Sequence, residues 1–203
     1  MSKLFRLLMV FAGLALVSMP AAAYEKGDWL LRVGVGAVDP KSNNSAIVSV
    51  DDGAALVFNG TYFLTPNIGF EILAATPFSH DIDLVADGSK AGETKHLPPT
   101  FSLQYHFMTD GTFRPYAGAG LNYTQFFDEE TTGALAGTSL DLDESFGLAL
   151  QLGADLDLSD RMFLGIDVRY IDIETTATVP EADLSFDVKI DPMVYSLTLG
   201  WKF

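Results

Sequence analysis

Apolar side chains recur at every second position through most of this chain. In residues 29–37 (WLLRVGVGA), Trp29, Leu31 and Val33 fall on one face, whereas Arg32 and Gly34 fall on the other. A period of two residues is typical of a β-strand that has one apolar face. The same alternation predicts eight strands, at residues 29–37, 56–64, 68–78, 101–107, 115–123, 146–158, 162–170 and 193–203.

The connections between these strands alternate in length. Short turns are predicted at residues 64–67, 109–112 and 159–161, where Pro, Asn, Asp, Gly and Ser gather. Four long segments lie between them, at residues 39–53, 79–97, 128–144 and 172–191. An even number of strands with short turns on one side and long loops on the other is typical of outer-membrane barrels. The pattern therefore predicts an all-β protein, an eight-stranded antiparallel transmembrane β-barrel with short periplasmic turns and four longer extracellular loops.

Alternation alone does not say which face of a barrel points outward. In a soluble eight-stranded barrel of the lipocalin type, the apolar face would point inward around a ligand. Two features favour lipid on the apolar face: the polar face is rich in glycine, which suits a narrow lumen, and the chain ends in Trp-Lys-Phe. Aromatic residues also lie near the strand ends, as interfacial girdles do. They are Trp29, Tyr62, Phe70, Tyr105, Phe107, Phe163, Tyr170, Tyr195 and Trp201.

The first 23 residues form a separate segment with a different pattern. Lys3 and Arg6 give a positive start, residues 7–17 are apolar, and three alanines follow Pro20 at residues 21–23. This order is typical of a secretory signal peptide. The apolar run is shorter than the roughly 20 residues that a membrane-spanning helix needs. We expect residues 1–23 to be a cleaved secretory signal peptide and residues 24–203 to be a single barrel domain.

Composition sharpens this picture. The 203 residues include 12 Lys+Arg, 27 Asp+Glu and no cysteine, with a net charge of −15. The charge balance excludes nucleic-acid binding through a basic surface, and the lack of cysteine excludes disulfides and thiolate metal sites. The sequence pI is about 4.3, yet the mean hydropathy is +0.22. The four long segments hold 19 of the acidic residues, so the acidity is expected on the loops and the hydropathy in the wall.

Several stretches resemble a known family. They are residues 71–78 (EILAATPF), residues 96–100 (HLPPT), residues 113–124 (FRPYAGAGLNYT) followed by Phe126-Phe127, residues 170–177 (YIDIETTA), and Asp191-Pro192 before the last strand. In this order and register the chain resembles the outer membrane protein W (OmpW) family. The longest stretch, at residues 113–127, is the most specific.

The resemblance implies a function and a location. It implies an eight-stranded barrel in the outer membrane of a Gram-negative cell, with a narrow channel for small hydrophobic molecules, no enzymatic activity and no cofactor. The expected partners are outer-membrane lipid, lipopolysaccharide and small hydrophobic solutes, together with the barrel assembly machinery through the C-terminal Phe203. A surface receptor or adhesin, or a structural barrel without transport, remains the alternative.

Six apolar residues point into the predicted lumen. Such side chains either fill the core of a small barrel, as interior side chains commonly do, or line a channel; the resemblance favours the channel. The residues are Leu30, Val57, Phe63, Leu73, Phe126 and Val194.

Three prolines stand where two neighbouring strands reach the long-loop side. Pro77 ends the third strand, and Pro98 and Pro99 begin the fourth. Because proline lacks the N–H that a strand ladder requires, the ladder is expected to fail there. Either the strands end at this point, or the wall opens sideways and lets an apolar solute leave the lumen into the membrane.

A group of polar residues shares the inward face. Charges inside a narrow barrel are expected to pair, because an isolated buried charge is costly, and such a network could also exclude ions and water. The presence of Arg169 argues against a fully hydrophobic channel. The residues are Arg32, Glu71, His106, Gln151, Asp155, Asp167 and Arg169.

The sequence offers little support for two other classes of site. A lipid-modifying enzyme would need a nucleophile and a base, and only Ser79 with His96 offers one. The acidic loops could bind Ca²⁺ through carboxylates, but no Asp-x-Asp-x-Asp-Gly loop occurs in the sequence. We therefore predict neither catalytic residues nor a metal site.

Overall fold

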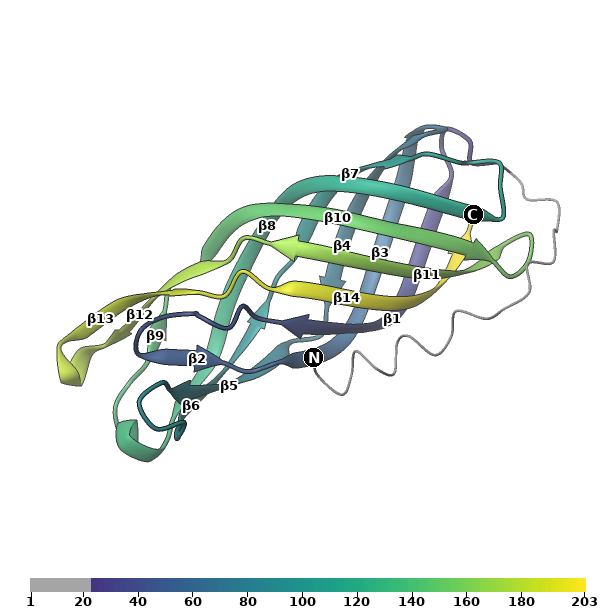
Figure 1. The fold of residues 1–203 in the computed structure, drawn as a ribbon. Coiled ribbons are helices and arrows are strands. Elements are labelled where there is room, and N and C mark those ends of the chain that lie inside the picture. The colour runs from purple at the N-terminus through teal and green to yellow at the C-terminus, as the bar shows by residue number, and fades with distance from the viewer. Residues whose placement is uncertain (1–22) are drawn as a thin grey trace.

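The structure, a computed structural model, describes residues 23–203 and forms a closed antiparallel barrel of eight long strands (Figure 1). In the order in which they pair around the ring, these strands are β1 (Trp29–Asp39), β3 (Gly53–Thr65), β4 (Ile68–Ala75), β7 (Thr100–His106), β8 (Phe113–Thr131), β10 (Ser145–Asp157), β11 (Met162–Ile171) and β14 (Met193–Lys202). The ring closes where β14 pairs with β1. Residues 1–22, most of the predicted signal peptide, lie outside the described part of the chain.

The eight predicted strands correspond to these eight long strands, so the prediction of an eight-stranded barrel is confirmed. Most boundaries differ by one to three residues, and one differs by more. The third strand ends at Ala75 instead of continuing to residue 78, and the fifth extends to Thr131, eight residues beyond its predicted end.

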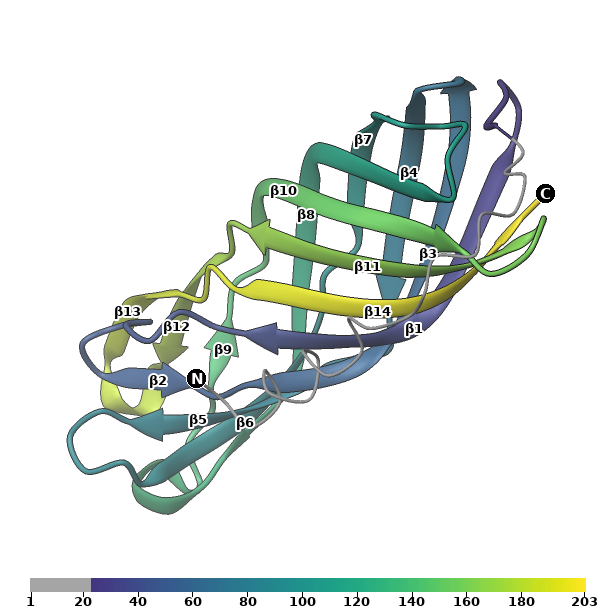
Figure 2. The same cartoon turned by 45° about the vertical axis from the view of Figure 1, so that its right-hand side comes forward.

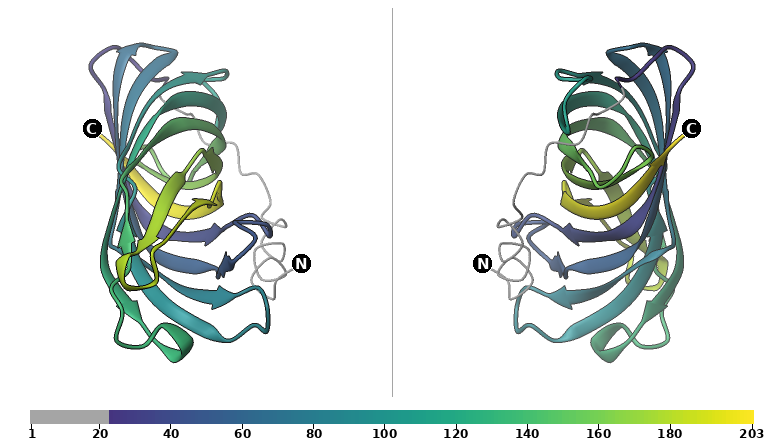
Figure 3. Two further views of the ribbon diagram at one scale, coloured as in Figure 1. Left: turned by 90° about the vertical axis from the view of Figure 1, so that its left-hand side faces the viewer. Right: turned by 90° about the vertical axis from the view of Figure 1, so that its right-hand side faces the viewer.

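The four long connections are present, and they contain short strands and 3-10 helices that the sequence pattern did not predict. They contain the strands β2 (Val48–Val50), β5 (Phe78–Leu84), β6 (Lys90–Leu97), β9 (Asp141–Leu142), β12 (Glu174–Val179) and β13 (Leu184–Lys189), and the short 3-10 helices η2 (Gly133–Leu135) and η3 (Pro180–Ala182). One layer contains β2, β5 and β6 and joins the barrel through β8; the other is a separate sheet of β13, β12 and β9. Figure 2 shows these layers projecting beyond one end of the barrel, and the left view of Figure 3 looks onto that end. We call this projecting part the outer half.

The outward face of the barrel is apolar. Leu121, Leu148 and Leu152 each expose more than 60% of their surface, and they lie on adjacent strands. Large exposed apolar surfaces of this kind need a lipid solvent. No helix among residues 23–203 is long and apolar enough to span a membrane. The orientation expected of an outer-membrane barrel is therefore observed, and the lipocalin-like alternative is wrong.

One of the predicted girdle aromatics is not on this outward face. Phe163 is fully buried inside the barrel, because its neighbour Leu164 takes the outward position on β11. Trp29 and Tyr62, by contrast, lie beside each other on the outer surface with ring centroids 5.0 Å apart.

The side-chain pattern reverses between β4 and β5. Even-numbered residues face outward in β4 but inward in β5. The ladder from β4 to β7 ends at Leu73 and Thr100, and the ladder from β5 to β6 resumes at Phe78 and His96. The register thereby shifts by one residue. A shift of one residue moves every following side chain to the opposite face, so the segment around Thr76 acts like a β-bulge.

Candidate functional site

Apolar and aromatic side chains fill the end of the lumen beside the short turns. Tyr24, Leu30, Phe63 and Phe163 form one buried cluster, in which the Tyr24 and Phe63 ring centroids are 4.4 Å apart. The Arg114 guanidinium lies 4.3 Å from the Tyr24 ring centroid, a cation–π geometry. We call this cluster the floor. Leu30 and Phe63, two of the six predicted lining residues, belong to it.

Two ion pairs cross the lumen above the floor. Arg32 on β1 donates to Asp155 on β10 at 2.7 Å and to Thr61 at 2.9 Å. Arg169 on β11 donates to Glu71 on β4 at 2.8 Å. All four charged side chains are buried to within about 1%. Because β4 and β11 lie on opposite sides of the ring, this second pair ties opposite walls together.

Neutral polar groups complete this network. Glu71 also accepts from the amide nitrogens of Asn59 at 3.0 Å and Gln104 at 2.7 Å. The Gln104 amide is within 3.0 Å of Gln151, and its oxygen lies 3.2 Å from the His106 ring. The structure thus brings together six of the seven predicted polar residues. The seventh, Asp167, is more loosely held, with its carboxylate 3.9 Å from the Arg169 Nε.

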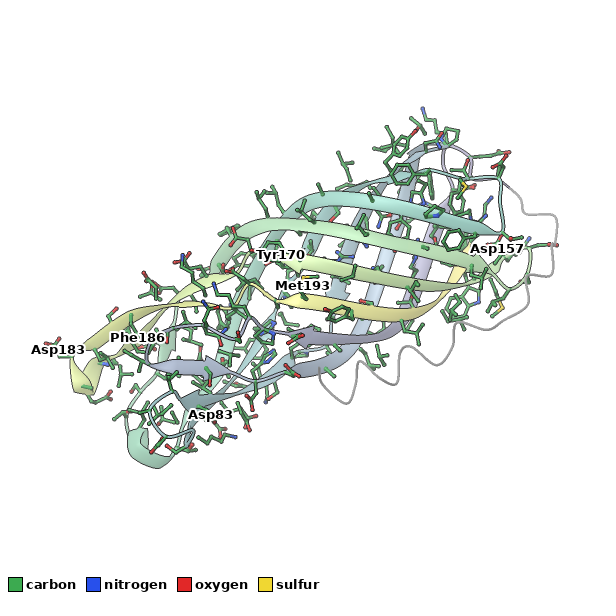
Figure 4. All side chains as sticks on the ribbon, viewed as in Figure 1. Asp83, Asp157, Tyr170, Asp183, Phe186 and Met193 are labelled. Carbon is green, nitrogen blue, oxygen red and sulfur yellow. The ribbon has the colours of Figure 1, made fainter. Side chains whose placement is uncertain are left out.

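Above the polar network, the interior becomes apolar and continues into the outer half. Val57, Leu73, Phe126 and Val194, the other four predicted lining residues, belong to one buried cluster there. Phe126 also lines a cavity of about 110 Å³ between the two layers of the outer half. The cavity wall is almost entirely aliphatic and aromatic. Figure 4 shows this half of the molecule, with Phe186, a lining residue from β13, labelled near its tip.

Two histidines stand among the mostly apolar side chains that line this cavity. His80 on β5 and His96 on β6 stack in parallel, with ring centroids 4.9 Å apart and planes 2° apart. Phe78 stacks on His96, with ring centroids 5.4 Å apart. Burial is the main cause that lowers the pKa of His96 to about 3, with His80 as a second cause. The pKa of His80 is also lowered by burial. Both rings are therefore neutral at pH 7.

The pair of nucleophile and base that an enzyme would need does not form. Ser79 lies on the solvent side of β5 and donates to Glu93 at 2.7 Å, whereas His96 faces the cavity. The strand alternation places them on opposite faces, which corrects the suggestion that Ser79 and His96 could act together. Among residues 23–203, no three metal-ligating side chains gather into a group that could hold an ion.

The three prolines flank the register shift between β4–β5 and β6–β7. On the β4 side, the Thr76 amide donates to Leu56 on β3 at 2.9 Å. On the β7 side, the Asn122 side chain on β8 donates to the carbonyls of Pro98 and Pro99 at 3.1 and 3.2 Å. Each edge is therefore bonded to the strand behind it, and the ladder between the edges is interrupted. We call this place the wall break.

Sequence reasoning missed several residues of the lumen. Tyr24 gave no signal because it precedes the first alternating segment, yet its hydroxyl donates to Asp155 at 3.2 Å. Gln104 and Asn59 are inward by alternation and could have been found. The place of His80 in the cavity gives no sequence signal of its own, because its segment carries the charged residues expected of a loop.

Comparisons with known proteins agree with this architecture. The model of the OmpW family matches residues 25–203. Outer membrane protein W of Vibrio cholerae is 46% identical, over 93% of this chain and 94% of its own length. The crystal structure of outer membrane protein OprG from Pseudomonas aeruginosa superposes with a TM-score of 0.81 at 35% identity, covering 89% of this chain and 98% of that one.

A more distant relative carries a name that mentions a pathway. The dibenzothiophene metabolism operon protein PahQ of Pseudomonas aeruginosa is 27% identical, over 85% of this chain and 77% of its own length.

Proposed function

The chain belongs to the OmpW family of outer-membrane proteins, and from this premise we propose that it passes small hydrophobic molecules from the cell exterior into the outer membrane. The observation that carries the proposal is the apolar cavity between the layers of the outer half. Apolar solutes leave water for such a cavity because of the hydrophobic effect. The name of the relative PahQ, which mentions the metabolism of an aromatic sulfur heterocycle, supports the same class of solute.

The polar network argues against a straight path through the lumen. A solute that moved from the cavity to the floor would have to separate buried pairs such as Glu71 and Arg169. Breaking a buried ion pair costs about 3–5 kcal/mol, and an apolar solute offers the charges no substitute partner. We infer that the solute leaves the lumen above this network.

The wall break is the exit that we propose. It lies at the height of the outer apolar cluster. Leu73 on β4, just before the break along the chain, and Phe78 on β5, just after it, both belong to this cluster. Opening it would break few hydrogen bonds, because Thr76 and Pro98 are already bonded to the strands behind them. Proline at the edges keeps the two strands from closing the ladder. An apolar solute would then enter the hydrocarbon without crossing the polar outer leaflet.

Cross-linking across the wall break tests the route. Thr76 and Leu97 would face each other if the β4–β7 register continued, so a short bridge between Thr76→Cys and Leu97→Cys should hold the break shut. We expect naphthalene uptake by cells producing this variant to fall to the level of cells without the protein, and reduction to restore it. The chain has no native cysteine to interfere.

The matched control is a bridge within the continuous ladder, between Ile72→Cys and Phe101→Cys, which are direct partners. This bridge should leave uptake unchanged. Full uptake through the bridged wall break would exclude the sideways route. Equal uptake with and without the unmodified protein would exclude transport altogether and favour a receptor, adhesin or structural role.

The proposal also includes partners at both ends of the barrel. Phe203 is 68% exposed at the end of β14, where its backbone pairs with Trp29; this leaves its ring available to the barrel assembly machinery. The acidic residues of the outer half face lipopolysaccharide phosphates, and divalent cations would relieve the repulsion between them. Stability of the barrel that is insensitive to Mg²⁺ in lipopolysaccharide bilayers would contradict this last point.

A further inference from the structure

The two cavity histidines, His80 and His96, carry polar atoms that the protein leaves without partners. We call them the histidine pair. Both residues are at most 2% exposed. The His80 Nε2 and the His96 Nδ1 are buried and have no hydrogen-bond partner in the structure. A buried polar atom without a partner is unfavourable, and here both residues that carry one line a cavity whose wall is otherwise mostly apolar.

The contacts of His80 fix which of its nitrogens can accept a hydrogen bond. The His80 Nδ1 lies 2.6 Å from the backbone oxygen of Asp51. A carbonyl oxygen only accepts, so Nδ1 carries the proton, and in the neutral ring Nε2 is left as an acceptor. Gly53 leaves room for this ring, because a Cβ there would lie 2.5 Å from the His80 Cε1. His96 has no such contact at Nδ1, so it can present either a donor or an acceptor.

We propose that the histidine pair is the polar anchor of the outer cavity and binds the hydroxyl group of a neutral, otherwise hydrophobic solute, such as a phenol or a small alicyclic alcohol. The hydroxyl donates its hydrogen to the His80 Nε2 and accepts one from His96. The proposal rests on the proposed function, since it names the class of solute that the same cavity selects.

A neutral hydroxyl fits this site better than other polar groups. An ether or ketone oxygen only accepts and would leave the His80 Nε2 without a hydrogen. A carboxylate would be repelled by Asp51, Asp52 and Asp81, whose charges act on His80. A charged amine would lose its hydration in a cavity walled by groups such as Val188 and Ile190.

A metal ion fits the histidine pair poorly. The lone pairs of imidazole nitrogens lie in the ring planes, and these two planes are parallel with ring centroids 4.9 Å apart. An ion bonded to both rings at the roughly 2.0 Å that zinc requires would lie far out of both ring planes, whereas a hydroxyl at about 2.8 Å tolerates the bend. Within residues 23–203, no third ligating side chain forms a metal-holding group with them.

The size of the cavity supports a single-ring solute. Its volume is about 110 Å³, and an apolar protein cavity of about 150 Å³ is known to accept benzene. The histidines come from the hairpin of β5 and β6, whereas Val188 and Phe186 come from β13, so the cavity lies between layers that belong to different sheets.

Binding of three small aromatic probes to the full mature chain in lipid nanodiscs tests the proposal. Phenol, anisole and toluene differ in whether they carry a donor and acceptor, an acceptor alone, or neither. Their affinities are measured after correction for partition into protein-free nanodiscs. We expect phenol to bind about tenfold more tightly than toluene, the worth of roughly one hydrogen bond, and anisole to resemble toluene. Only phenol should shift the ¹⁵N resonance of the His80 Nε2.

The variants His96→Phe and His80→Phe/His96→Phe keep the ring stack and remove the nitrogens. Each should lower phenol affinity about tenfold and leave toluene affinity unchanged, and retained toluene binding shows that the cavity has folded. The matched control is His106→Phe, the same substitution at the buried histidine near the floor, far from the cavity. It should leave the ratio of phenol to toluene affinity as in the unmodified protein.

Three outcomes would overturn the proposal: equal corrected affinities for phenol and toluene, equal losses of both in the variants, or Zn²⁺ binding that the variants abolish while phenol binding persists. None of these requires transport. If phenol binds as expected but cells take up no hydrophobic solute, the site stands and the proposed function fails. If cells take up hydrophobic solutes but phenol shows no preference over toluene, the proposed function stands and the hydroxyl site fails.

Discussion

At the scale of single residues, the lumen depends on Glu71. One carboxylate oxygen accepts from Arg169 and the other from both Asn59 and Gln104. These four residues come from four different strands, so one side chain links a large part of the ring. Such a carboxylate is well compensated while all its partners remain, and it becomes an uncompensated buried charge when one of them is lost.

Removal of Arg169 should therefore destabilise the barrel strongly. We expect Arg169→Met to lower the free energy of unfolding by about 3–5 kcal/mol, because Glu71 is left charged and buried. Urea unfolding in lipid vesicles, followed by tryptophan fluorescence, measures the change.

Two further variants make this expectation specific to burial. Glu71→Gln/Arg169→Met removes both charges and should recover most of the loss. Lys189→Met breaks the ion pair of Lys189 with Glu174, in which both side chains are about half exposed, and should cost far less because solvent screens such a pair. Equal losses in Arg169→Met and Lys189→Met would show that the lumen pairs contribute no more than surface pairs.

The alternation of the sequence identifies these residues as inward but not as partners. Arg32 meets Asp155 and Glu71 meets Arg169 because the tilt and stagger of the strands set which heights coincide across the ring. That stagger is a property of the closed sheet. It leaves no local signal near Glu71 or Asp155. The sequence therefore predicts that the inward charges pair, but it does not predict which residue pairs with which.

At the scale of elements, the reversal between β4 and β5 separates two kinds of strand. In β4 the apolar side chains of Phe70 and Ile72 face lipid, whereas in β5 those of Phe78 and Ile82 face the interior. The outer half is therefore built like a water-soluble protein, with polar groups outside and apolar groups inside. The shift of one residue at the wall break allows β4 to turn its apolar side chains toward lipid and β5, which follows it, to turn them toward the interior.

This arrangement makes the outer half sensitive to acid. The pKa of His96 is lowered to about 3 by burial, whereas an unfolded segment would have the ordinary value of about 6.5. Between pH 6.5 and 3 the unfolded outer half binds more protons than the folded one. The free energy of unfolding of the outer half therefore falls as the pH falls. We expect a loss of up to about 1.4 kcal/mol per pH unit in this window.

Amide hydrogen exchange can locate this effect. Protection factors in β5 and β6 should fall between pH 6 and pH 4, whereas those in β14 should change little. In His96→Phe the protection factors of β6 should fall less, because only His80 of the two buried histidines remains to titrate. A fall of equal size in the variant would assign the pH dependence to other groups, such as the carboxylates near His80.

The strands of the outer half were missed because their pattern has the opposite sense. In residues 78–84, Phe78, His80 and Ile82 alternate with Ser79 and Asp81, which is a strand pattern with a polar outside. Charged residues at the outward positions indicate a loop wherever the outward face is expected to be apolar. The membrane strands were found because their apolar face is continuous, while these short strands depend on the layers that cover them.

At the scale of the whole molecule, the floor fills the lumen at the end beside the short turns. The wall break interrupts the barrel wall near the opposite end. Tyr24 joins the floor to the polar network, since its ring contacts Phe63 and its hydroxyl donates to Asp155. The floor should therefore restrict ions and water without affecting a solute that leaves through the wall break.

Truncation of Tyr24 should separate the two routes. We expect Tyr24→Ala to raise ion conductance in planar bilayers severalfold, because the floor loses a fully buried ring, and to leave naphthalene uptake unchanged. The matched control is Tyr105→Ala at the same end of the barrel, where the tyrosine is 49% exposed to lipid; conductance should not change. Uptake that rises together with conductance would indicate that solutes pass through the floor.

The reversal around Thr76 also fixes the depth at which the protein sits. On β8 the outward face changes from apolar to polar at a similar height, since Leu121 and Gln125 both face outward. A thicker bilayer would bury the outward charges of Asp81 and Asp83 in hydrocarbon, and a thinner one would expose the leucines below. Hydrophobic mismatch must therefore be absorbed by the lipids, which will thin or thicken around this barrel because its own belt has a fixed height.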